Sequence, residues 1–194
     1  MNELLQHQIE RRESKGSTVF LQAPDVKNGV GGLRDYQGIL WMAKVKFNLI
    51  GLKGLIDKKY LTEQEAKSFE DAYSFLLRVR NELHFRSSRP VETLHLEKQP
   101  DIALGLGYPQ ECIFRRVEAF MGDYYTKAQT IHQMSGILEE RLVHANSGNT
   151  SKLSFRNVLK AYRAAPSQKV DDFDLREDIL STADTKIFDK DPER

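Results

Sequence analysis

Apolar residues recur every three or four positions along three long stretches of the chain, which is the spacing of amphipathic α-helices. The stretches cover residues 36–50, 69–83 and 113–142. Ahead of the second stretch stand Thr62 and Glu65, a capping-box pair in which each side chain accepts a hydrogen bond from a free backbone donor of the other. The pattern therefore predicts three long helices.

The ends of these helices can also be predicted. Asp35 stands where the N-cap of the first helix is expected, and Gly51 is expected to end it. Pro109 suits the first turn of the third helix. Residues 1–13 carry apolar positions at helical spacing, and the β-branched and aromatic run at 18–21 predicts a short extended stretch. Long helices joined by turns indicate an all-α fold, an antiparallel helical bundle.

Composition shifts divide the chain into parts. Residues 1–144 are expected to form the bundle, and residues 145–152 are polar and turn-forming, as in a linker. Residues 153–194 are expected to be a helical tail that either completes the bundle or begins the next domain. Its two short helices are predicted around 155–162 and 175–187.

The charge of the chain is balanced, with 29 Lys and Arg residues against 28 Asp and Glu and a net charge of +1. This balance argues against a general affinity for nucleic acid or for anionic membranes, so any anion site must be local. The single cysteine, Cys112, is interpreted as a small buried apolar residue in a reducing compartment. Because no apolar run is long enough to cross a bilayer and the N-terminus is charged, we expect a cytoplasmic protein.

A glycine-rich loop at residues 25–35 directly precedes the first long helix. Lys27 and Arg34 place two cations there, and glycines allow a backbone to approach a partner closely. These are ingredients of a phosphate-binding loop, although the spacing differs from a P-loop and also suits an ordinary tight connection. The glycines concerned are Gly29, Gly31 and Gly32.

A second cluster of polar residues lies on the helix predicted over residues 69–83. The side chain of Arg80 starts beside the apolar stripe, so it is expected either to pair with a carboxylate such as Asp35 or to face a cleft that receives an anion. His84 suits a neutral core histidine better than a general base. The histidines show no ligand spacing with Asp, Glu or Cys, and we predict no metal site in this chain.

These stretches together resemble the bacterial protein-PII uridylyltransferase and uridylyl-removing family, in the helical region that follows its catalytic domain. Residues 24–35, with Trp41 after them, are similar to the family signature Pro-Asn-x-Lys-x-x-x-Gly-Gly-Leu-Arg-Asp. Residues 75–84, 94–108 and 120–125 follow as further matching blocks in the expected order. The resemblance covers about residues 18–143.

The resemblance implies a bacterial enzyme of nitrogen regulation that transfers UMP from UTP to a PII-type signalling protein. Residues 1–144 would then follow a nucleotidyltransferase domain and form a helical bundle similar to the substrate-binding domains of nucleotidyltransferases. Mg²⁺ and UTP would be bound by the full-length parent, with none of its cofactors held by this fragment. The implied partners are the preceding nucleotidyltransferase domain, the PII-type protein and the nucleotide, without nucleic acid or membrane.

The sequence itself carries no catalytic motif of that family. A nucleotidyltransferase core needs a Gly-Ser turn followed by an Asp-x-Asp pair for two metal ions, and no such pair follows Gly16-Ser17. No His-Asp dipeptide is present for a metal-dependent phosphohydrolase. Ala23 also stands where the family has glutamate before proline. We therefore expect no catalytic residue here and no activity of this fragment alone.

Two interpretations of function follow. In the first, the bundle caps a nucleotidyltransferase active site, with Lys27 and Arg34 facing phosphate, Asp35 capping its helix, and Arg80 and His84 as a possible supporting anion strip. In the second, the bundle is a non-catalytic protein-interaction or regulatory module, and the glycine loop is only a joint. The second interpretation predicts an exposed apolar patch and no nucleotide binding.

Overall fold

A computed structural model describes residues 2–16, 18–87, 90–144, 168–170, 173–176 and 179–182. The chain divides into two compact units, Met1–Asn146 and Ser147–Arg194. Within the described residues, the first unit contains one short 3₁₀ helix and six α-helices. The helices are α1 (Asn2–Ser14), α2 (Leu33–Phe47), α3 (Gly51–Asp57), α4 (Glu63–Phe85), η1 (Leu96–Lys98), α5 (Gln99–Gly105) and α6 (Ile113–His144).

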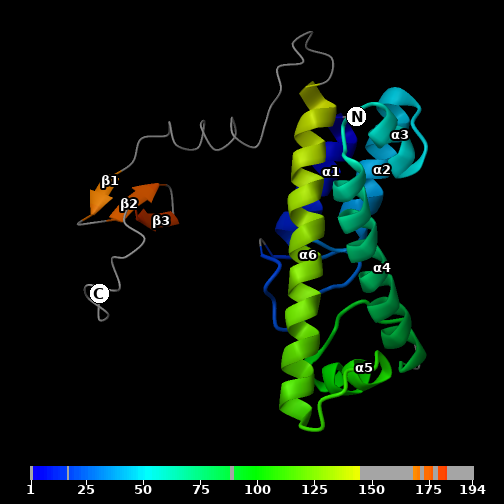
Figure 1. Ribbon diagram of the computed structural model, residues 1–194, viewed down its shortest axis with the longest axis vertical. Helices are drawn as coiled ribbons and strands as arrows, with labels where there is room; N and C mark the ends of the chain where they lie inside the picture. Colours follow the sequence, from blue (N-terminus) through cyan, green and yellow to red (C-terminus); the bar gives the residue numbers. More distant parts are fainter. Residues whose placement is uncertain are drawn as a thin grey trace. The chain divides into compact units, whose positions relative to one another are not determined.

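Four of these helices form an antiparallel bundle (Figure 1). Helices α1, α2, α4 and α6 alternate in direction, and α6, the longest, packs against both α2 and α4. Helix α5 lies at the end of the bundle where α4 finishes and α6 starts, and α3 lies at the opposite end. The all-α class predicted from the apolar periodicity is confirmed for this unit.

The apolar stripes of the helices meet in one continuous core. Periodicity places the buried side chains of each helix on one face, and burying each large apolar side chain contributes roughly 1.5–3 kcal/mol. The ring of Tyr36 on α2 stacks on that of Tyr73 on α4, with centroids 4.0 Å apart. The largest fully buried side chains include Ile39 and Met42 of α2, Phe69, Leu76 and Leu83 of α4, and Phe120, Ile131 and Leu138 of α6.

Local signals set the helix ends, although not always where the sequence predicts them. The capping box at the start of α4 is confirmed: the Thr62 side chain accepts from the Glu65 N–H group, and the Glu65 carboxylate accepts from the Thr62 N–H group. Helix α2 ends before Gly51, because Asn48 adopts a left-handed conformation with φ 54° and its N–H group bonds back into the last turn. Gly51 instead begins α3.

In the second unit, three described strands form an antiparallel sheet in the order β1-β2-β3. They are β1 (Gln168–Val170), β2 (Phe173–Arg176) and β3 (Ile179–Thr182). The helix predicted around residues 175–187 is therefore wrong for residues 175–176 and 179–182, and the rest of that range lies outside the described residues. The helical prediction rested on apolar residues on both sides of the acidic pair Glu177-Asp178. In the structure, Leu175 of β2 is instead paired with Leu180 on the neighbouring strand β3. The linker at 145–152 and the helix predicted at 155–162 lie outside the described residues.

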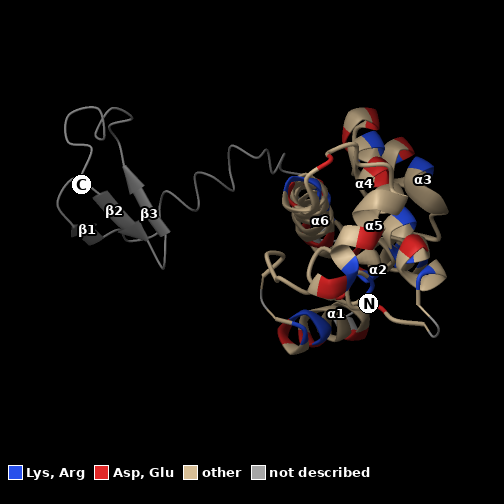
Figure 2. Cartoon of the chain, turned by 90° about the horizontal axis from the view of Figure 1, so that it is seen from below, with Lys and Arg blue, Asp and Glu red and all other residues tan. Residues whose placement is uncertain are grey.

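The surface of the bundle carries charges of both signs on the same helices (Figure 2). Some pair along one helix, as Arg115 and Glu118 do on α6. Cys112 is exposed, so its interpretation as a buried apolar residue is wrong; it lies directly before the first residue of α6. No helix among the described residues combines the length and apolar character that a membrane span requires.

Candidate functional site

The glycine-rich loop folds back on itself before α2. The carboxylate of Asp25 accepts hydrogen bonds from the backbone N–H groups of Lys27 (3.1 Å) and Asn28 (2.7 Å). The Asp25 carbonyl accepts from the N–H group of Gly29 at 2.9 Å. A backbone bridge between Asp25 and Thr93 joins this loop to the segment after α4. The loop is therefore a turn held in shape by hydrogen bonds between its own residues.

The first N–H groups of α2 are also used within the loop. Leu33 donates to the Val26 carbonyl (3.1 Å), and Arg34 donates to the Lys27 carbonyl (2.9 Å). A helix N-terminus attracts anions mainly through N–H groups that lack a partner. Because these donors are engaged, an anion at this end of α2 would have to be bound by side chains.

The glycines of the loop are buried and contact protein atoms. Gly31 has φ +70°, and a Cβ atom built on it would lie 2.1 Å from the backbone oxygen of Ala128 on α6. A Cβ atom on Gly29 would lie 2.5 Å from the Asp25 carbonyl oxygen. Gly32 is buried as well and is the N-cap of α2. In this structure the glycines allow the loop to pack against α6 and against itself.

Asp35 is fully buried and lies at the centre of an ion-pair network. It is the third residue of α2, so the predicted N-cap role is wrong and its carboxylate instead accepts from the Gly31 N–H group at 2.8 Å. The guanidinium groups of Arg11 and Arg12 on α1 both donate to it, the latter at 3.0 Å. Arg12 also donates to both carboxylate oxygens of Glu139 on α6, at 3.0 and 2.7 Å.

This network corrects the suggested pairing of Asp35 with Arg80. Two arginines of α1 occupy the carboxylate, and Arg80 pairs instead with Glu92, to which it donates from Nε at 2.7 Å and from Nη2 at 2.5 Å. The expectation that Arg80 forms a structural ion pair is therefore confirmed with a different partner. No spacing rule identified α1 as the source of the arginines, because they lie more than twenty positions before Asp35.

Two other basic residues identified from the sequence, Lys27 and His84, also lie near the Glu92 carboxylate. Lys27 Nζ lies 3.8 Å from it, and His84 Nε2 lies 3.7 Å from it. The His84 Nε2 atom is buried and has no hydrogen-bond partner among the described residues. The hydrogen bonds from Arg80, and then its charge with those of Lys27 and His84, lower the pKa of Glu92 against the opposing effect of burial. Lys27, Arg80 and His84 therefore lie together, apart from Asp35.

Replacing Glu92 by glutamine should destabilise the protein by about 1–3 kcal/mol at neutral pH, the usual cost of losing hydrogen bonds to a charged group. Because folding lowers the pKa of Glu92 below its ordinary 4.5, the stabilisation is complete above pH 4.5 and is lost as the pH falls through the folded value. Urea unfolding of both proteins between pH 7 and about pH 3 measures the difference. A difference that stays constant across this range would contradict the assignment.

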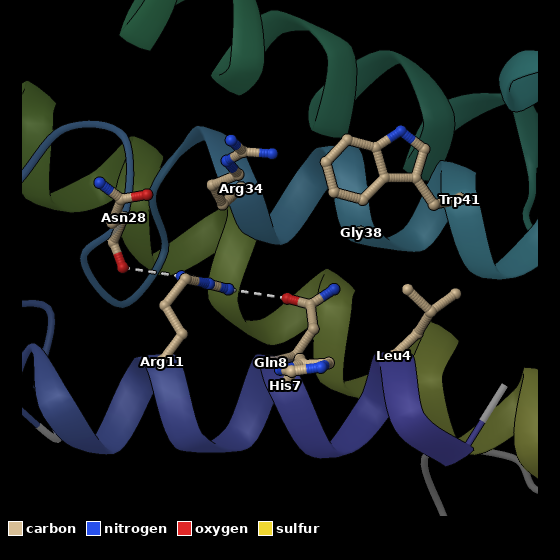
Figure 3. A pocket seen from close by; sticks show the side chains of 8 residues that line it. All are labelled: Leu4, His7, Gln8, Arg11, Asn28, Arg34, Gly38 and Trp41. Carbon is tan, nitrogen blue, oxygen red and sulfur yellow. Dashed lines mark hydrogen bonds between the residues drawn. The ribbon is translucent and has the colours of Figure 1, made fainter.

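A pocket of about 300 Å³ lies between α1 and the start of α2 (Figure 3). Arg34 and Trp41 come from α2, and the guanidinium carbon of Arg34 lies 5.3 Å from the centre of the indole ring. Arg11 donates to the Asn28 carbonyl and to Gln8 Oε1, both at 2.7 Å. Side chains of α1 thus point toward those of α2 across the pocket. The residues lining it are Leu4, His7, Gln8, Arg11, Asn28, Arg34, Gly38 and Trp41.

Arg34 is the predicted site residue whose side chain remains available to a ligand. Among the described residues its guanidinium has no hydrogen bond or ion pair, whereas Lys27 and Arg80 both face Glu92. Sequence reasoning did not identify Gln8, Arg11 or Trp41 as parts of this site.

The protein is a helical bundle built around a Gly-Gly-Leu-Arg-Asp block. Ion pairs hold this block at the start of α2, and a pocket lies beside it. A family model described as GlnD PII-uridylyltransferase matches residues 1–139. The chain belongs to the PII-uridylyltransferase family.

Several curated relatives carry the name "Bifunctional uridylyltransferase/uridylyl-removing enzyme". The protein from Bradyrhizobium sp. strain ORS 278 is 30% identical over 187 residues, which cover 94% of this chain and 20% of the relative. The protein from Pseudomonas aeruginosa strain LESB58 is 35% identical over 133 residues, 68% of this chain and 15% of the relative. The chain thus spans about a fifth or less of the length of these relatives. No solved structure gave a significant match.

Proposed function

We propose that the bundle is the helical, nucleotide-facing part of a uridylyltransferase-like nucleotidyltransferase that transfers UMP from UTP to a PII-type signalling protein. Family membership and the names of the relatives support this proposal. The observation that carries it is the contrast between neighbours in the Gly-Gly-Leu-Arg-Asp block. Asp35 is held inside the bundle by ion pairs with α1, whereas Arg34 lines a pocket and has no ion pair within the part of the chain that the structure describes.

In this proposal the bundle works beside a nucleotidyltransferase domain and is inactive without it. The described residues hold no group of three His, Cys, Asp or Glu side chains placed to bind a metal ion. In this proposal Mg²⁺ and the triphosphate chemistry belong to the neighbouring domain. Arg34 would meet a phosphate from the side of the bundle, with Lys27 more distant because it is drawn to Glu92. We place this activity in the bacterial cytoplasm.

Arg34→Ala tests the proposal. UTP with Mg²⁺ is titrated calorimetrically into this chain and into a protein in which a relative's nucleotidyltransferase domain precedes it. We expect binding only in the longer protein, and a Kd at least about tenfold weaker for Arg34→Ala, because a charge-assisted hydrogen bond contributes about 1.5–3 kcal/mol. Arg115→Ala, which removes an exposed arginine of α6, is the matched control. Equal UTP affinity of Arg34→Ala and the unaltered longer protein would refute the phosphate role.

The interaction module is the second candidate, and exposed apolar side chains favour it. Phe85 at the end of α4 and Phe114 at the start of α6 are each 85% exposed. A contiguous patch of such side chains would mark a surface that another protein covers. If the titration shows no UTP binding in either protein while both are folded, this candidate becomes the better account of the bundle.

A further inference from the structure

The pocket between α1 and α2 has an uncompensated positive charge. Of its two arginines, Arg11 donates to Asp35, Gln8 and the Asn28 carbonyl, so its charge and donors are used. Arg34 has no such partner among the described residues. Of the residues that the structure describes, no aspartate or glutamate lines the pocket. A guanidinium in a pocket without a carboxylate favours an anionic ligand.

A buried amide group supplies a second donor to the same pocket. Gln8 is only 6% exposed, and its Nε2 atom is buried without a hydrogen-bond partner in the described residues. Its Oε1 atom accepts from Arg11, which fixes the amide orientation and leaves Nε2 as the free end. A Cβ atom on Gly38 would lie 1.4 Å from Nε2, so the glycine makes room for this amide. A buried donor without a partner is costly, and a ligand oxygen would satisfy it.

The walls of the pocket are suited to a flat or apolar molecule. The indole of Trp41 is 46% exposed, and Leu4 faces it from α1 (Figure 3). The guanidinium carbon of Arg34 lies over the indole ring, 5.3 Å from its centre, so the cation and the flat ring belong to the same part of the pocket. A guanidinium can donate two parallel hydrogen bonds to the two oxygens of a planar carboxylate.

We propose that this pocket binds a small organic carboxylate with a flat or apolar body. The carboxylate accepts from Arg34 and from Gln8 Nε2, and the body lies between Trp41 and Leu4. A single uncompensated charge suits a monoanion, and a volume of about 300 Å³ is at the small end for ligand sites. The inference goes beyond the proposed function and does not depend on it, although both use Arg34.

Trp41 makes the test direct, because it is the only tryptophan of the chain. Benzoate is titrated into the full chain while tryptophan fluorescence is recorded, with benzamide as the uncharged probe of the same shape. We expect a saturable change with benzoate and none with benzamide. Arg34→Met should weaken benzoate binding at least tenfold and Gln8→Leu several-fold, whereas Lys53→Met, on an exposed position of α3, should leave it unchanged.

The comparison of the two probes in the unaltered chain does not depend on the folding of any variant. Equal responses to benzoate and benzamide, or no saturable response to either, would overturn the proposal. So would phenyl phosphate binding ten times more tightly than benzoate, which would indicate a phosphate site. Benzoate binding without UTP binding in the longer protein supports this inference and counts against the nucleotide role. UTP binding that displaces benzoate supports both roles, because both ligands use Arg34. UTP binding with no saturable benzoate response supports the nucleotide role and overturns this inference.

Discussion

Replacing Asp35 by asparagine is expected to lower the free energy of unfolding by about 3–5 kcal/mol, the usual cost of removing one partner from a buried ion pair. The side chain of Asp35 is fully buried, and the side chains of Arg11 and Arg12, whose guanidinium groups donate to it, are only 18% and 15% exposed. Asparagine keeps the shape and can still accept from the Gly31 N–H group, so the substitution removes mainly the charge. Urea unfolding at neutral pH measures the loss.

A matched control separates this burial effect from a general effect of lost charge. Glu118→Gln on α6 also removes one carboxylate that pairs with an arginine, but both side chains are at least 70% exposed. Its effect should stay within about 0.5 kcal/mol, because solvent screens exposed pairs. Limited proteolysis adds a local readout: α1 should be cut sooner in Asp35→Asn, since it loses its main polar tie to α2. A cost below about 1 kcal/mol would show that the ion-pair network does not hold α1.

Local signals in the sequence predicted the three long helices α2, α4 and α6, but not the short helices α3 and α5 or the long-range partners of the charged residues. The Thr62–Glu65 capping box depends on residues three positions apart, so it could be identified from the sequence and it starts α4 where expected. The partners of Asp35 and Arg80 come from other segments, and periodicity shows only that each charge needs a partner. Glu92 follows a proline-containing segment without any pattern that marks it as the partner of Arg80.

The candidate site shows the same limit. A glycine loop beside two cations is compatible both with phosphate binding and with close packing. For Gly31 the structure favours close packing, because the carbonyl of Ala128 on α6 leaves no room for a Cβ atom. Arg34 was identified because it stands in the loop. Gln8 lies on α1 within a charged N-terminal segment, and its burial against Gly38 becomes visible only when α1 and α2 are placed together.

Gly31→Ala is expected to destabilise the protein by about 3 kcal/mol or more. The left-handed backbone at φ +70° costs an alanine about 1–2 kcal/mol. The added Cβ atom would also lie 2.1 Å from the Ala128 backbone oxygen, which cannot rotate away as a flexible side chain can. The loop or α6 must therefore shift, and the hydrogen bond from the Gly31 N–H group to Asp35 should weaken with it. Thermal and urea unfolding measure the loss.

Gly122→Ala provides a control of opposite sign. Gly122 lies on the exposed surface of α6, and no atom is within 4 Å of the position that its Cβ would occupy. Because alanine favours helix by about 1 kcal/mol over glycine, this variant should be slightly more stable than the unaltered chain. If Gly31→Ala were tolerated as well as Gly122→Ala, the loop could not be packed tightly against α6. The three glycines would then again suit a ligand-facing loop, and the packing role assigned to Gly31 would be wrong.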